Sequence, residues 1–145
     1  MHKHLIGLAI ALSFGLGGSA FAAGPMSKDA SKSEKDKIEA QAKTDKQACA
    51  GMKENAKDIC QAEAKAKEKI AKAELDAKNK PGAKADEKVR MMKAEGEYEV
   101  AKEKCEDQKG TVMATCKKDA KVTYDKAKAD ARQANINTAG EAKKS

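Results

Sequence analysis

The sequence predicts an all-α fold of two tandem disulfide-stapled αα-hairpins, four helices in total, that follow a cleaved signal peptide. Three observations lead to this prediction. Ten residues separate Cys49 from Cys60, and ten residues also separate Cys105 from Cys116. The two cysteine pairs lie 56 positions apart, and the residues around them match at the same offset. The remaining sequence is dominated by Ala, Lys and Glu, which are strong helix formers.

The 56-residue offset indicates an internal duplication. Matching residues recur at equivalent positions around the two cysteine pairs. The matches are Glu39 with Glu95, Lys46 with Lys102, Lys53 with Lys109, Ala64 with Ala120, Lys65 with Lys121, and the segment 71–74 with 127–130.

Residues 1–22 have the features of a secretory signal peptide. A basic start is followed by an apolar run over residues 5–16 and a small-residue ending, which together predict cleavage near Ala22/Ala23. The alternative is an uncleaved membrane anchor, but the run is shorter than the ~20 apolar residues of a spanning helix. We therefore expect a periplasmic or secreted protein with no transmembrane segment in the mature chain.

Export changes how the four cysteines are interpreted. An even number of cysteines in an oxidising compartment favours disulfides, whereas the same residues in the cytosol would suggest zinc. A Cys-only metal site lacks support, because there is no C-x2-C spacing and no His outside residues 1–22. The sequence therefore predicts no metal site and no cofactor.

The composition favours long helices with a thin core. Aromatic residues make up 3% of the chain and charged residues 37%, a balance that would also fit disorder. Helices packed through Ala-rich stripes would bury little area, so we expect two disulfides of ~2–4 kcal/mol each to matter. Five acid–base pairs also have the favourable i,i+4 order: Glu39–Lys43, Glu63–Lys67, Glu68–Lys72, Glu74–Lys78 and Asp86–Arg90.

The first hairpin is predicted over residues 34–79, after a flexible tail over residues 23–33. Its helices are expected at 34–53 and 56–78. The second of these carries small and apolar residues at three- and four-residue steps, which is typical of a buried helix face. These residues are Ile59, Ala62, Ala66, Ile70, Ala73 and Ala77.

The second hairpin is predicted over residues 84–134. A linker over residues 80–83 precedes it and contains a Pro-Gly stop signal. Its helices are expected at 84–109 and 112–134, and a disordered tail at 135–145. The predicted core stripes are Met91, Tyr98 and Cys105 on the first helix, and Cys116, Ala120, Thr123, Ala127, Ala131 and Ala134 on the second.

Helix geometry limits how the cysteines can pair. Residues eleven apart in one continuous helix lie about 16 Å apart along its axis. A disulfide needs Cα atoms about 4.4–6.8 Å apart. Cys49 can therefore bond to Cys60 only if the chain folds back between them, and the same holds for the second pair.

The midpoints of both pairs carry residues that favour such a fold. Asn55 is a good N-cap in the first pair, with Asp58 in the first turn that follows. Gly110 is a preferred residue at a helix end, and Thr111 is a good N-cap. These residues favour Cys49–Cys60 with Cys105–Cys116.

Other connectivities remain open from the sequence. Two continuous antiparallel helices could be joined by Cys49–Cys116 and Cys60–Cys105. A parallel pairing of the cysteines and free thiols are the remaining alternatives.

Two resemblances rest on these segments. Residues 61–74 and 126–130 resemble the Ala/Lys/Glu-rich helical stalk of the cell-envelope protein TolA. The duplicated Cys-x10-Cys unit, with the sequence NAKDIC at 55–60 and EAK at 63–65, is similar to a group of small exported proteins of Proteobacteria. The resemblances imply a periplasmic helical protein with a role in the envelope, and they imply no catalytic residues.

The residue types also bound the function. Without His outside residues 1–22, His-based acid–base and triad chemistry is absent, and no Gly-rich phosphate loop is present. We therefore expect no enzyme, but a non-catalytic periplasmic structural or interaction protein of the cell envelope. The sequence does not identify its partner, and the candidates are another envelope protein and an anionic envelope polymer.

Two alternatives stay open. The net charge of +7 and the pI of about 9.1 suggest a binder of anionic envelope polymers or lipids. The cysteines suggest a periplasmic thiol redox or metal-scavenging protein. Scarce aromatic residues argue against nucleic acid, because single-strand binding relies on base stacking.

Overall fold

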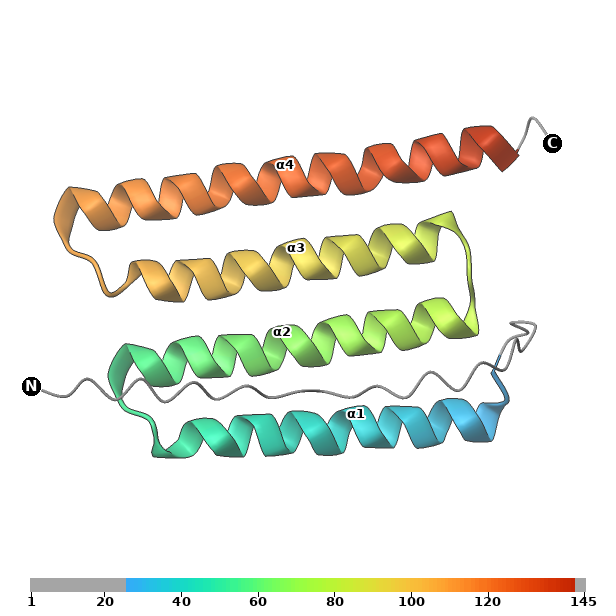
Figure 1. Ribbon diagram of the computed structural model, residues 1–145, viewed down its shortest axis with the longest axis horizontal. Coiled ribbons are helices and arrows are strands. Elements are labelled where there is room, and N and C mark those ends of the chain that lie inside the picture. The colour runs from blue at the N-terminus through green and yellow to red at the C-terminus, as the bar shows by residue number, and fades with distance from the viewer. Residues whose placement is uncertain (1–25, 143–145) are drawn as a thin grey trace, which may run out of the picture.

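The structure, a computed structural model, describes residues 26–142 and consists of helices connected by short turns (Figure 1). The all-α prediction is confirmed, and no strand occurs in residues 26–142. The predicted signal peptide and the last three residues lie outside this range. The helices are α1 (Lys28–Ala48), α2 (Glu54–Asn79), α3 (Ala83–Cys105) and α4 (Gly110–Ala142), with a 3-10 turn, η1, at Cys49–Gly51.

The four helices lie side by side in chain order as a single layer (Figure 1). α1 packs on α2, α2 on α3, and α3 on α4, and within the described chain α1 and α4 do not touch. The predicted pair of hairpins is therefore present as α1–α2 and α3–α4. Because the inner helices α2 and α3 each have two neighbours, each must bury two faces.

α2 shows how this requirement is met. Ala62, Ala66 and Ala73 from the predicted stripe are buried on the side of α3. A second set, Ala64 and Leu75, is buried on the side of α1. These two residues lie four before and seven after Glu68, which bonds to α1, and such steps return to the same helix face.

The buried core is thin. Leu75, which is 6% exposed, is the one large aliphatic residue among the buried residues of the described chain, and most other buried side chains are Ala. Each Ala contributes little hydrophobic free energy, at ~0.8 kcal/mol per buried methylene-sized group. The buried hydrophobic residues are Ala42, Cys49, Ala62, Ala64, Ala66, Ala73, Leu75, Ala94, Cys105 and Ala131.

Small residues let α2 and α3 approach closely. A Cβ atom added to Gly96 would lie 2.7 Å from the Cβ of Ala66 and 3.4 Å from its Cα. Since real Cβ atoms do not come so close, the spacing of these helices depends on Gly at this position. Gly96 therefore determines how closely the two hairpins pack at the contact between α2 and α3.

The disulfides have the favoured pairing. Cys49–Cys60 and Cys105–Cys116 each join Cα atoms 5.7 Å apart, beside the turn of their hairpin. The alternative of Cys49–Cys116 with Cys60–Cys105 is wrong, and no described cysteine is free. Cys49 and Cys105 are 0% and 1% exposed.

The turns differ from the predicted capping. Asn55 lies inside α2, and its Nδ2 donates to the Glu103 carbonyl oxygen at 2.7 Å instead of capping the helix. Thr111 likewise lies inside α4. Both helices begin instead with a residue in the left-handed region, Glu54 at φ 50° and Gly110 at φ 59°. These two residues are equivalent in the 56-residue repeat.

This equivalence makes a prediction about stability. The left-handed backbone conformation costs a non-Gly residue roughly 1–2 kcal/mol of folding free energy. Gly avoids this cost, but part of the gain is offset because Gly has greater conformational freedom in the unfolded chain. We expect Glu54→Gly to stabilise the protein by about 0.5–1 kcal/mol and Gly110→Ala to destabilise it by about 1 kcal/mol. Urea unfolding of both variants measures this, and equal effects in the same direction would contradict it.

The helices also differ from the predicted lengths. α1 begins at Lys28 because the Ser27 side chain accepts from the Ala30 N–H at 3.2 Å, so residues 28–33 are helical instead of a tail. α4 continues to Ala142, so the disorder predicted from residue 135 is wrong for 135–142. α1 ends five residues and α3 four residues earlier than predicted, where the turns begin.

In each hairpin an Asn side chain joins the two helices at the end opposite the turn and its disulfide. Asn79 Nδ2 donates to Ser31 Oγ at 2.7 Å, from the last residue of α2 to the first turn of α1. Asn135 donates in the same way to the Glu87 carboxylate. Each pair spans 48 residues, and the two are repeat equivalents. The hairpins are therefore fastened at both ends, by a disulfide and by an Asn.

Candidate functional site

The described residues hold no arrangement typical of a metal site. No group of three or more His, Cys, Asp or Glu residues in the described chain could hold a metal ion. Within residues 26–142 no helix is both long and apolar enough to cross a membrane. Four sequence-predicted site residues, the cysteines, are brought together as two disulfides.

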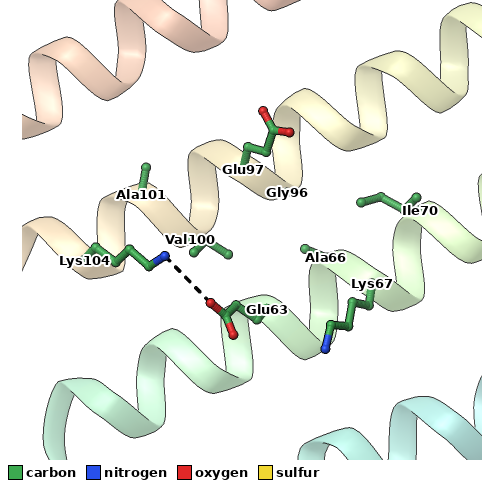
Figure 2. Close-up of a pocket in the computed structure, with 9 residues that line it drawn as sticks. All are labelled: Glu63, Ala66, Lys67, Ile70, Gly96, Glu97, Val100, Ala101 and Lys104. Carbon is green, nitrogen blue, oxygen red and sulfur yellow. Dashed lines mark ion pairs between the residues drawn. The ribbon is translucent and has the colours of Figure 1, made fainter. Parts of the chain in front are cut away.

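A groove between α2 and α3 is the feature best suited to a ligand (Figure 2). Its volume is about 350 Å³. The floor is formed where the small residues Ala66 and Gly96 bring α2 and α3 into close contact, and Ile70 and Val100 add apolar surface beside them. The full lining is Glu63, Ala66, Lys67, Ile70, Gly96, Glu97, Val100, Ala101 and Lys104.

Charged side chains border this apolar floor. Lys104 Nζ lies 3.8 Å from Glu63 Oε1 and bridges the groove at one end, as Figure 2 shows. Lys67 on α2 and Glu97 on α3 have no ion-pair partner in the described chain. The lining offers alkyl groups, carboxylates and ammonium groups, but no hydroxyl, thiol or imidazole. Such a groove can bind an apolar side chain with charged flanks.

A cluster of three charges joins α1 to α2. Glu68 accepts from Lys46 at 2.6 Å and from Lys72 at 2.7 Å. The hydrogen bond from Lys46, followed by that from Lys72, lowers the pKa of Glu68 to about 2. The bond to Glu68 also raises the pKa of Lys72.

The repeat keeps both lysines in the second hairpin but changes what lies between them. Lys102 and Lys128 are equivalent to Lys46 and Lys72, whereas Tyr124 replaces Glu68. The Tyr98 and Tyr124 rings stack with centroids 4.8 Å apart and planes 7° apart. Each lysine Nζ lies 4.9 Å from the centroid of the ring on its own helix. In the second hairpin the stacked pair of Tyr98 and Tyr124 therefore lies between the two lysines, where the first hairpin has the Glu68 carboxylate.

Sequence reasoning missed this cluster, although the offset contained the signal. Lys46 and Lys102 were already aligned, but Tyr98 was assigned only to a core stripe. Comparing the residues between equivalent lysines would have shown the exchange of Glu68 for Tyr124.

Glu68 makes the first hairpin sensitive to acid. Its folded-state pKa of about 2 lies below the ordinary 4.5, so its contribution is complete above pH 4.5 and is lost as the pH falls towards 2. Because Lys46 and Lys72 are nearly half exposed, solvent screening limits the loss to about 1 kcal/mol. Thermal unfolding between pH 6 and pH 2 measures it. Glu68→Gln is expected to remove this part of the pH dependence, and an unchanged profile would contradict the assignment.

Ion pairs also cross the junction between the hairpins. Lys69 Nζ on α2 bonds Glu95 at 2.8 Å and Glu99 at 3.1 Å on α3, and these bonds raise its pKa. Lys93 bonds Glu74 at 2.9 Å across the same junction.

Of the five predicted i,i+4 pairs, the structure shows Glu68–Lys72. Acids from three others reach lysines on neighbouring helices instead. These contacts are Glu39–Lys72, Glu63–Lys104 and Glu74–Lys93. The charges therefore hold helices together more than they support single helices.

Comparison of the chain with family models, with curated proteins and with solved structures finds no match. The resemblances to the TolA stalk and to the exported Proteobacterial proteins therefore stay predictions. The function is argued from the geometry alone.

Proposed function

We propose that this chain is a non-catalytic structural or interaction protein of the cell envelope. It acts in the periplasm or outside the cell after the signal peptide 1–22 is removed near Ala22/Ala23. The observation that carries the proposal is the single layer of four stapled helices, which leaves two broad faces and the α2–α3 groove open to a partner. The disulfides suit an oxidising compartment.

The chemistry of the groove supports binding more than reaction. A catalytic site needs a nucleophile or a positioned acid and base, and the groove lining supplies exposed carboxylates and ammonium groups on an apolar floor. Thiol redox chemistry has little support, because Cys49 and Cys105 are buried within their disulfides. The expected partner is an envelope protein that inserts an apolar side chain with charged neighbours.

Site-specific photo-crosslinking in living cells tests this function. A photoreactive residue at Val100 faces the groove, whereas one at Lys65 on the exposed side of α2 is the control. We expect a discrete adduct with one envelope protein from position 100 and none from position 65. The adduct should form again when the two purified proteins are mixed. Equal labelling from both positions, or none from either, would contradict the proposal.

Binding of anionic envelope polymers or lipids is a second candidate. The observation that favours it is the cluster in the second hairpin, where Lys102 and Lys128 lie over aromatic rings, whereas the equivalent Lys46 and Lys72 bond to the Glu68 carboxylate. Vesicles with and without acidic lipid, at low and high salt, test this idea. Binding to acidic vesicles that weakens with salt and with Lys102→Gln plus Lys128→Gln would support it. Absence of binding at low salt would dismiss it.

A further inference from the structure

The contact between α2 and α3, which we call the inner junction, is related by the 56-residue duplication to the two outer edges of the layer, on α1 and α4. Adding 56 to residues on the α3-facing side of α2 gives residues on α4, and subtracting 56 from the α2-facing side of α3 gives residues on α1. We call these surfaces the α4 flank (Lys118, Val122, Asp125, Ala129, Asp130, Arg132 and Ile136) and the α1 flank (Lys32, Lys37, Glu39, Ala40, Lys43 and Thr44). Both lie at the outer edges of the layer and consist of exposed residues, of which Glu39 also reaches Lys72 on α2 at 3.8 Å.

We propose that the α4 flank of one copy of this chain binds the α1 flank of the next. The two helices would pack antiparallel, as α2 packs on α3 within the chain. The partner of each flank is thus a second copy of the chain, and the contact between the copies would resemble the α2–α3 contact within one chain. Since the two flanks are different surfaces, the contact is heterologous and extends the layer from copy to copy.

Charge complementarity at equivalent positions supports this pairing. Lys69 bonds Glu99 at 3.1 Å across the inner junction, and the equivalent flank residues are Asp125 and Lys43. Both signs are reversed together, so the attraction is preserved. A single random substitution would instead have produced repulsion.

A second ion pair keeps its signs. Glu74 bonds Lys93 at 2.9 Å across the inner junction. The equivalent flank residues are Asp130 and Lys37, again an acid on the even-numbered helix and a lysine on the odd-numbered helix. Two of the inner ion pairs therefore have attractive counterparts between copies.

Apolar residues follow the same surface. Val122, Ala129 and Ile136 recur at seven-residue steps on the α4 flank, and Val122 and Ile136 are 61% and 62% exposed. Val122 is equivalent to Ala66, and its expected neighbour Ala40 is equivalent to Gly96. A second helix packed along this stripe would cover the exposed apolar area of Val122 and Ile136.

Other substitutions make the outer contact weaker than the inner one. Asp125 would face Glu39 as well as Lys43, and Arg132 would face Lys32 where the inner junction pairs Asp76 with Lys88. We therefore expect reversible assembly that depends on protein concentration and salt.

Zero-length carbodiimide cross-linking gives a specific test on the purified full chain with its disulfides intact. Asp125 and Lys43 lie on opposite edges of the layer, so an amide bond between them can form only between copies. The Lys69–Glu95 contact inside the chain, at 2.8 Å, is the positive control. Mass spectrometry is expected to find both cross-links. If mass spectrometry detects the Lys69–Glu95 cross-link but no Asp125–Lys43 cross-link at high protein concentration, the proposal is overturned.

Charge reversal gives a second test. Lys43→Glu is expected to weaken assembly roughly tenfold, which is the effect of about 1.4 kcal/mol, because Asp125 would then face two carboxylates. Adding Asp125→Lys to this variant reproduces the inner arrangement of Lys69 with Glu95 and Glu99, and should restore assembly. Arg132→Asp, which reproduces the inner Asp76, should strengthen assembly. Lys65→Glu on the exposed side of α2 is the control.

Sedimentation velocity over a range of concentrations gives the readout. The expected result is an average mass that rises without a plateau at twice the monomer mass. A monomer at every concentration, a closed dimer, or a double variant without rescue would each overturn the proposal.

Discussion

Reduction of the two disulfides is expected to abolish most of the helical circular dichroism of this protein at 37 °C. Each disulfide closes a loop of sequence separation 11, which contributes about 3 kcal/mol by restricting the unfolded chain. Small domains have total stabilities of only about 5–15 kcal/mol. With a core made mostly of Ala, the hydrophobic contribution cannot replace both disulfides.

The two hairpins can be tested separately. Replacing Cys49 and Cys60 together by Ser opens the first, and replacing Cys105 and Cys116 opens the second. Each double variant is expected to lose about 3 kcal/mol in urea unfolding. Treatment with a reductant should have no further effect on a variant that lacks all four cysteines. A reduced protein with the same melting temperature as the oxidised one would contradict the importance of the disulfides.

Gly96→Val is expected to destabilise the protein by about 3 kcal/mol, at the upper end of overpacking effects. The first added atom alone would lie 2.7 Å from the Ala66 Cβ, and neither backbone can yield without separating α2 from α3. The helix propensity gained by replacing Gly is below about 1 kcal/mol and is smaller than this cost. The loss should appear in urea unfolding and as faster amide exchange along α2 and α3.

Two further variants separate this steric cause from a general effect of Gly substitution. Gly51→Val is the matched control, because nothing lies within 4 Å of a Cβ at that position. Combining Gly96→Ala with Ala66→Gly moves the methyl group to the other helix and should cost little. If Gly51→Val is as harmful as Gly96→Val, the close helix approach is not the cause.

The hairpins and their disulfides could be predicted because they depend on local properties. With the 1.5 Å rise per residue of a helix, a bond within each cysteine pair needs the chain to fold back between the two cysteines, and the turn residues at both midpoints favoured that connectivity over continuous helices. Ala62, Ala66 and Ala73 were identified because their three- and four-residue steps form one continuous stripe. These features need no knowledge of how the hairpins meet.

The remaining features depend on contacts between distant residues. Ala64 and Leu75 were not predicted to be buried, because only the position of α2 between two neighbours requires a second stripe. Asn55 has the properties of a cap, but it donates to Glu103 on another hairpin. The groove could not be predicted either, since it exists only where Ala66 and Gly96 meet.

The distance between α1 and α4 tests the single layer most directly. Spin labels at Gln47 and Ala114, introduced as noncanonical amino acids, leave the disulfides intact, and both positions are exposed at the same end of the layer. Three helix spacings of 8–10 Å predict a separation of roughly 25–30 Å in dilute solution by pulsed electron spin resonance. A distance of about 10 Å, as in a closed four-helix bundle, would contradict the open layer and the surfaces inferred from it.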